Sequence, residues 1–206
     1  MLAAHVERDV DAWAAKVAAT GRVRVAPFVR EARAVEYLRA LQSSEHVSFG
    51  DLDRDRGFRA WSFAWETGHV CEHPLCELGR WLRGPGVAWA SAVTGRSLRA
   101  PDDPLVMSDE HRKGGFADAR PVSEAYFSSA PRSAVALVHL CPQPWPEAWG
   151  GHRELLDGDG TVIERIAPTW NALDLIDLER PGLRWRTPLV DHHVRGFVVS
   201  ASFDRA

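Results

Sequence analysis

The spacing of apolar residues changes near the middle of the chain. Before about residue 112, apolar residues recur every three or four positions, the period of an amphipathic helix. Val6–Ala19 shows this period, and Gly21 stands where such a helix would end. The same pattern predicts further helices, and a short apolar run predicts a strand. These segments are helices over 29–41, 75–82 and 87–93, and a strand over 59–65.

From about residue 116 onward the apolar residues form short runs bounded by glycine, proline and aspartate, as in β-strands. Predicted strands lie at 133–140, 161–166, 172–178, 183–190 and 196–203. Several short strands at spacings near ten residues favour a sandwich or barrel. We therefore predict one domain, mainly β with N-terminal helices (α+β). Residues 1–112 would form a mostly helical part packed on a β core of residues 113–206.

Composition excludes several classes of partner. The chain has 206 residues and a formal net charge of -3, so no overall positive field would attract nucleic acid or an acidic membrane surface. It has no apolar run long enough to cross a bilayer and no signal-peptide pattern. Three cysteines are too few for a disulfide scaffold. We expect a cytoplasmic protein that acts on a small molecule, and a homodimer is compatible with the sequence.

Four signals follow one another in the C-terminal half. An arginine enters a buried strand, a tryptophan precedes a double glycine, a proline and an aromatic residue precede another strand, and an arginine enters the last strand. In order these are Arg132 before 133–140; Trp145 or Trp149 before Gly150, Gly151 and Leu155; Pro168, Trp170 and Asn171 before 172–178; and Arg195 before 196–203.

This order resembles the core of the Fe(II)/2-oxoglutarate-dependent oxygenases, in the prolyl-4-hydroxylase-like branch. The resemblance implies a double-stranded β-helix, which is a jelly-roll or cupin-like core. It also implies an iron site built from His-x-Asp and a distal histidine. Counted from the flanking signals, those three positions hold Val122, Glu124 and Arg184.

Only one of these three residues can donate to a metal. Valine has no lone pair to donate, and arginine stays protonated. We therefore predict a degenerate triad with no bound metal and no favoured cofactor, in which Glu124 and Arg184 form an ion pair where iron would sit. Alternatively, the iron and 2-oxoglutarate are retained through other histidines: His139, His152 or the pair His192–His193.

The resemblance also assigns a carboxylate anchor, because the arginine that opens the last strand holds the far carboxylate of the cosubstrate in that family. Here that residue is Arg195, and strand alternation predicts that Phe197, Val199 and Ala201 lie on the same side, which we expect to face the pocket. The other candidate residues are Glu124 and His139 as acid–base groups, and Arg184, Tyr126, Trp170 and Asn171 in the binding pocket.

Two further segments have a less specific pattern. The stretch 69–76 contains two histidines and two cysteines, but its spacing favours incidental residues at a helix entry over a zinc site. Residues 111–115 form a basic, glycine-containing loop that could cover a barrel mouth.

Three functions are consistent with these observations. The favoured one is a metal-independent enzyme on the oxygenase fold, a cyclase, lyase or isomerase, acting on a carboxylate-bearing small molecule. The first alternative is an active Fe(II)/2-oxoglutarate hydroxylase with non-standard ligands. The second is a non-catalytic interaction protein on the same fold.

Overall fold

The computed structural model describes residues 2–43, 59–63, 74–101, 106–111, 113–114, 116–121, 132–179 and 183–206. Its helices are α1 (Ala4–Arg8), α2 (Val10–Thr20), α3 (Glu31–Gln42), α4 (Pro74–Arg83), α5 (Pro85–Thr94) and the short 3-10 helix η2 (Glu147–Trp149). Its strands are β1 (Arg22–Val25), β2 (Arg59–Phe63), β3 (Leu98–Arg99), β4 (Val106–His111), β5 (Ala117–Pro121), β6 (Ala134–Leu140), β7 (Arg153–Leu156), β8 (Val162–Ile166), β9 (Ala172–Asp177), β10 (Arg184–Thr187) and β11 (Gly196–Arg205).

The helices lie close to where the apolar period predicts them. The first predicted helix is divided at Asp9 into α1 and α2, and Gly21 ends α2 in a left-handed conformation with φ 76°. Such a φ is accessible to glycine at little cost, which explains why the helix stops there. Helices α4 and α5 are separated at Gly84, and Pro85 begins α5, a position where its missing N–H has no intrahelical partner.

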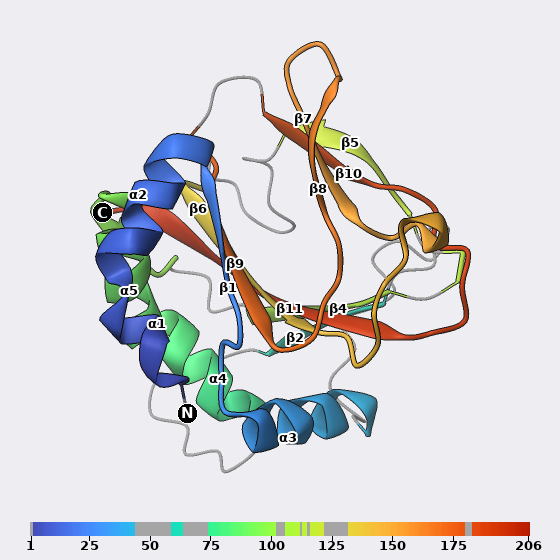
Figure 1. Ribbon diagram of the computed structural model, residues 1–206, viewed down its shortest axis with the longest axis horizontal. Helices are drawn as coiled ribbons and strands as arrows, with labels where there is room; N and C mark the ends of the chain where they lie inside the picture. Colours follow the sequence, from blue (N-terminus) through green and yellow to red (C-terminus); the bar gives the residue numbers. More distant parts are fainter. Residues whose placement is uncertain are drawn as a thin grey trace.

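The strands form two antiparallel sheets that face each other (Figure 1). The larger sheet has the order β1-β9-β6-β11-β4-β2, with β3 paired to β11, and the smaller has the order β5-β10-β7-β8. From β4 to β11 the chain passes repeatedly between the two sheets, which is the winding of a double-stranded β-helix. The predicted fold class is therefore confirmed.

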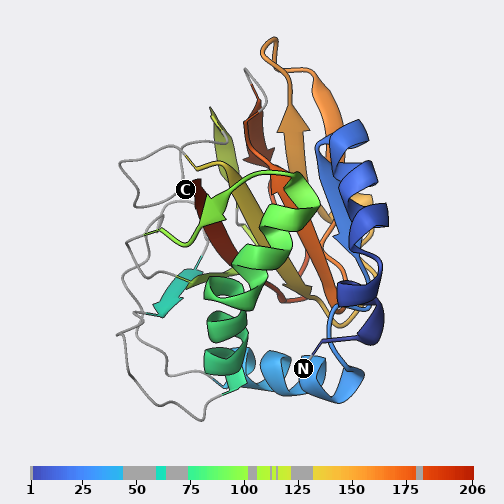
Figure 2. The same cartoon turned by 90° about the vertical axis from the view of Figure 1, so that its left-hand side faces the viewer.

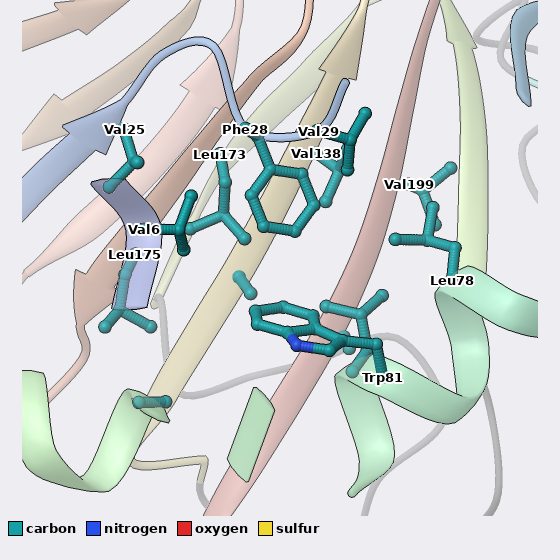
Figure 3. Close-up of a cluster of buried hydrophobic side chains, with 14 of the residues drawn as sticks. Val6, Val25, Phe28, Val29, Leu78, Trp81, Val138, Leu173, Leu175 and Val199 are labelled. Atoms are coloured by element: carbon teal, nitrogen blue, oxygen red, sulfur yellow. The ribbon is translucent and has the colours of Figure 1, made fainter. Parts of the chain in front are cut away.

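The helices cover one face of the larger sheet, as the two views in Figures 1 and 2 agree. The principal core lies in this layer, where Phe28 and Trp81 meet edge to face with ring centroids 5.1 Å apart. Val138 of β6, Leu173 of β9 and Val199 of β11 point into the same cluster (Figure 3). No helix in the described part of the chain is long and apolar enough to cross a membrane.

The other face of the larger sheet looks toward the smaller sheet. The space between them, called here the barrel interior, holds a second cluster that includes Leu137 and Val198 from the larger sheet and Leu155 and Ile166 from the smaller. Because β6, β9 and β11 are buried on both faces, the barrel interior and the helix layer share the same three strands. This arrangement decides which side chains can reach a site inside the barrel.

Five strands were not predicted from the sequence: β1, β3, β4, β5 and β7. Four strands of the larger sheet, β1, β2, β3 and β4, precede residue 112, so the sheet draws on both halves of the chain. The β1 sequence, Arg-Val-Arg-Val, does alternate, with both valines buried in the helix layer. It is too short, at four residues, to stand out beside the long α2 pattern.

Candidate functional site

A buried carboxylate lies on the inner face of the larger sheet. Asp174 of β9 pairs with Leu137 on one side and with Arg24 of β1 on the other, and its side chain is 0% exposed. Arg24 Nη2 donates to Asp174 Oδ2 at 2.6 Å, and Arg22 Nη1 donates to Oδ1 at 2.5 Å. A buried carboxylate needs such partners to remain ionised. The N-terminal strand β1 therefore supplies two cations to the barrel interior.

His139 of β6 completes this group. Its side chain is 4% exposed, and Nε2 lies 2.8 Å from Asp174 Oδ2. Burial lowers the pKa of His139, and the contact with Asp174 offsets this only in part. Burial opposes ionisation of Asp174, but the hydrogen bonds with His139 and Arg24 outweigh it and hold the pKa of that carboxyl well below its usual range. A neutral imidazole therefore faces an ionised carboxylate.

A third arginine approaches from the smaller sheet. Arg153 of β7 pairs with Ile166, which belongs to the interior cluster. The guanidinium carbon of Arg153 lies 4.4 Å from the ring centroid of Trp185. This is a cation–π arrangement. The positive charge of Arg153 also lowers the pKa of His139, so the two side chains are electrostatically coupled. Arg153 thus places a cation on the interior face of the smaller sheet.

Arg22 also joins the two sheets. Its guanidinium contacts Glu164 of β8 in addition to Asp174 of β9. The side chains of Arg22 and Glu164 are 17% and 32% exposed, so this ion pair lies nearer the surface than Asp174 does. The polar group inside the barrel consists of His139, Asp174, Arg22, Arg24, Glu164 and Arg153, and is called here the interior polar cluster.

The structure places one predicted catalytic residue, His139, in the barrel interior. Glu124 and Tyr126 lie outside the described residues, as does Val122, so the predicted Glu124–Arg184 ion pair stays a prediction. Sequence reasoning missed Asp174 and the three arginines of the interior polar cluster. The alternation of β9, Ala-Leu-Asp-Leu-Ile-Asp, was the available signal, because Asp174 shares a face with the buried Ile176.

Arg184 opens β10 opposite Pro121, the last residue of β5. Its Nη2 donates to the carbonyl oxygen of Ala119 at 2.9 Å. The neighbouring residues Leu183 and Trp185 belong to the interior cluster. Strand alternation therefore directs the Arg184 side chain to the opposite face of the smaller sheet.

The predicted pocket face of β11 is wrong. Phe197, which is 0% exposed, lies with Val199 and Ala201 in the helix layer, and the interior cluster contains Val198 instead. Arg195 is exposed and its guanidinium lies 5.5 Å from the Phe197 ring centroid. Burial cannot distinguish the two faces of this strand, because both are covered.

Asn171 and Trp170 also have structural contacts in place of the predicted ligand contacts. The Asn171 amide accepts from Val29 N at 3.0 Å and donates to Val29 O at 2.8 Å. Trp170 packs against the helix layer and donates to Glu31 Oε1 at 2.8 Å. Both residues therefore fasten the loop before α3 to the sheet.

Replacing Asn171 with alanine is expected to lower the free energy of unfolding by about 2 kcal/mol, because it leaves the buried backbone groups of Val29 unpaired. Asn171 has φ 48°, which alanine tolerates poorly. Asn171→Gly keeps that φ without strain and loses only the hydrogen bonds, so it should lose about 1 kcal/mol less. Urea unfolding measures both variants. Equal stability of the alanine variant and the natural chain would contradict this role.

Two other candidate histidines, His192 and His152, have partners outside the interior polar cluster. His192 stacks on Trp149, with ring centroids 3.4 Å apart, and its Nδ1 accepts from Val194 N. His152 Nε2 lies 3.2 Å from Glu154, whose carboxylate also binds Arg165 and Arg186. The described residues contain no group of three or more His, Cys, Asp or Glu side chains that could hold a metal. Residues 69–73 of the histidine–cysteine stretch, and residues 112 and 115 of the basic loop, lie outside the described residues.

Comparison with solved structures identifies the fold. The chain is similar to a prolyl-4-hydroxylase from Pseudomonas putida, with a TM-score of 0.66 and 13% identity over 96% of this chain and 99% of that one. It is also similar to a Trichoplax adhaerens prolyl hydroxylase in complex with a hypoxia inducible factor peptide, with a TM-score of 0.69 and 17% identity over 98% and 91% of the two chains.

A third similar structure is SnoN, a non-heme alpha-ketoglutarate-dependent epimerase from nogalamycin biosynthesis. It has a TM-score of 0.64 and 16% identity over 97% of this chain and 84% of that one. No protein-family model and no curated protein matches the sequence. At these identities the likeness establishes the fold, which is that of the prolyl-hydroxylase-like 2-oxoglutarate/Fe(II) oxygenases, and function depends on the site.

Proposed function

We propose that this chain is a metal-independent enzyme on the oxygenase fold, which binds a carboxylate-bearing small molecule in the barrel interior and transforms it without redox chemistry. The observation that carries the proposal is the pairing of Arg153 with Trp185 on the interior face of the smaller sheet, which looks toward the strand that carries His139. A guanidinium binds a carboxylate through two parallel hydrogen bonds. The neighbouring imidazole provides acid–base chemistry at neutral pH.

Of the three positions where the resemblance places iron ligands, only 184 lies within the described residues, and it offers no metal ligand. Where the resemblance places the distal histidine, the chain has Arg184, and the residues on either side, Leu183 and Trp185, face the interior. The Arg184 side chain points away from the barrel interior, and neither leucine nor tryptophan supplies a metal ligand. We therefore derive no step through iron. The proposed reaction is a cyclisation, elimination or isomerisation.

In this proposal the residue that binds the carboxylate is Arg153, and not Arg195, which the sequence analysis assigns to that role. Arg195 lies over Phe197 on the helix side of the larger sheet, whereas Arg153 approaches the interior cluster from the smaller sheet. A charge-assisted hydrogen bond contributes about 1.5–3 kcal/mol, which corresponds to a change of about 10–100-fold in affinity. The two arginines therefore make a matched pair for mutation.

The test is calorimetric titration of chelator-treated protein with 2-oxoglutarate and with succinate. We expect binding without added Fe(II), an unchanged Kd when Fe(II) is supplied under anaerobic conditions, and no stoichiometric iron in the protein. Arg153→Met should weaken binding about 10–100-fold. Arg195→Met should change the Kd less than about threefold, because a surface charge distant from the ligand contributes little.

Two results would contradict the proposal. Bound iron at one per chain, with iron-dependent conversion of 2-oxoglutarate to succinate, would establish the hydroxylase alternative; the ligand search would then begin at His139. If Arg153→Met bound the acids normally and Arg195→Met did not, the carboxylate would bind to Arg195, as the sequence analysis predicts. A chain that binds neither acid would favour the non-catalytic alternative.

A further inference from the structure

The two ring nitrogens of His139 have different surroundings. Nε2 lies 2.8 Å from Asp174 Oδ2, and an ionised carboxylate can only accept a hydrogen bond. The proton of the neutral imidazole is therefore on Nε2, and Nδ1 has the free lone pair. Within the described part of the chain, both ring nitrogens are buried and neither makes a hydrogen bond of regular geometry, although Nε2 lies close to the Asp174 carboxylate. Buried polar atoms are nearly always paired in native proteins, so an unpaired one in a barrel interior indicates a group supplied by a ligand.

The orientation of His139 depends on residues of β1, which precedes the strands β4 to β11 that form the winding. Asp174 is bound by Arg24 and Arg22, which come from β1, about 150 residues earlier in the chain, as the separations of 150 and 152 residues show. Arg24 Nη2 also donates to the carbonyl oxygen of Ala167 at 3.0 Å, so its guanidinium is fixed at both ends. A carboxylate held in this way can fix the tautomer and ring orientation of a histidine.

We infer that His139 is the base of a proton transfer on the bound carboxylic acid, with Nδ1 as the atom that takes the proton, and that Asp174, held by Arg24 and Arg22, is its positioning residue. This inference rests on the proposed function, because it needs a carboxylate on Arg153. It identifies the substrate class as an acid with a removable proton on a carbon near its carboxylate or oxo group, and the reaction class as isomerisation or elimination.

The proton transfer needs no other reactant. The Nδ1 lone pair forms a bond to the proton, the C–H bond breaks, and its electron pair moves into the adjacent carbonyl to form an enolate. The charge of Arg153 stabilises the new oxyanion. In an isomerisation, the imidazolium then returns its proton to carbon; in an elimination, it gives the proton to the leaving group as that bond breaks with its electron pair. His139 ends neutral in both cases.

The charged groups that face His139 determine how it titrates. Among the described residues, Asp174 from β9, Arg24 from β1 and Arg153 from β7 act on His139 directly. Arg22 from β1 contacts Asp174, and Glu164 from β8 contacts Arg22. Arg24 and Arg153 both disfavour the imidazolium. Removing Arg24 should therefore raise the pKa of His139. As the pH is lowered, the imidazole would then be protonated earlier, and the proton-transfer rate would begin to fall at a higher pH.

The first experiment is NMR of protein labelled with nitrogen-15 at histidine. We expect His139 to show the neutral tautomer protonated at Nε2 between pH 6 and 8, with Nδ1 as an acceptor. His139→Gln assigns the signal. Arg24→Gln, which keeps Asp174 and Arg22, should move the midpoint of titration to higher pH. A tautomer protonated at Nδ1, or a midpoint that does not move in Arg24→Gln, would overturn the inference.

The second experiment follows exchange of the C3 protons of 2-oxoglutarate with deuterium in D2O, in the presence of EDTA. We expect His139→Gln to lower the kcat of exchange at least 100-fold with little change in KM, because its amide can still donate to Asp174 but cannot act as a base. Arg153→Met should mainly raise KM.

The outcomes separate this inference from the proposed function. Binding of 2-oxoglutarate without exchange above the rate in buffer, or equal exchange by His139→Gln and the natural chain, would overturn the role of His139 and leave carboxylate binding intact. Failure of the protein to bind 2-oxoglutarate would contradict the proposed function itself. The NMR experiment would still decide whether Nδ1 of His139 carries the free lone pair.

Discussion

Replacing Asp174 with asparagine is expected to lower the free energy of unfolding by about 3–5 kcal/mol. The substitution keeps the size of the side chain but removes the negative charge that Arg24 and Arg22 share inside the barrel. Breaking a buried ion pair from one side leaves the other charge uncompensated, which is one of the more costly substitutions in proteins. The two arginines are 29% and 17% exposed, so partial solvation places the effect nearer the lower end of that range.

Urea unfolding at pH 7 measures this change, and Glu36→Gln provides a matched control. Glu36 also pairs with an arginine, Arg33, but the two side chains are 46% and 39% exposed on one helix. Exposed pairs of this kind contribute less than about 1 kcal/mol. Equal losses in the two variants would mean that Asp174 is not the centre of a buried network.

The pH dependence of stability provides an independent check. The pKa of Asp174 is held below its usual value in the folded state, so its stabilising contribution is complete above the unfolded pKa, about 3.9, and is lost as the pH falls below it. The pKa of His139 is also lowered, so its contribution has the same sign and begins to be lost below about pH 6.5. The gap in stability between the natural chain and Asp174→Asn should therefore narrow below about pH 4.

The sequence predicted the architecture because its strongest signals are local. The helical period of α2 and α3, the glycines after α2 and α5, and the apolar runs of β6 and β11 all act over a few residues. The winding of the barrel followed from the order of these signals in a resemblance to a known fold. Short strands with charged residues, such as β1 and β7, do not carry enough apolar pattern to be recognised alone.

The site was harder to predict because it depends on which face of a strand looks inward. Every residue of β6 is buried, so alternation cannot reveal that His139 lies in the barrel interior while Val138 lies in the helix layer. A one-residue error exchanges the two faces, as happened for β11. The partners of Asp174 could not be found either, because Arg22 and Arg24 approach it from a distant part of the sequence.

Gly150→Ala is expected to lower the free energy of unfolding by at least about 3 kcal/mol. Gly150 has φ 65° and ψ -157°, a conformation that is costly for any residue with a side chain. A Cβ added there would lie 1.7 Å from the carbonyl oxygen of Leu189, so the backbone itself would have to move. The same segment receives hydrogen bonds that close one end of the barrel: Trp145 Nε1 donates to Gly150 O at 2.6 Å, and Asp191 N donates to Trp149 O at 2.8 Å.

Gly158→Ala is the control for this variant, because a Cβ at Gly158 meets nothing within 4 Å, and the change should stay within about 0.5 kcal/mol. Urea unfolding compares the two, and the near-ultraviolet circular dichroism of Trp145 and Trp149 reports on the end of the barrel. Because Gly151 leads directly into β7, displacement of Gly150 should also move Arg153 and weaken carboxylate binding. Full stability in Gly150→Ala would mean that the double glycine is not the close approach on which the position of β7 depends.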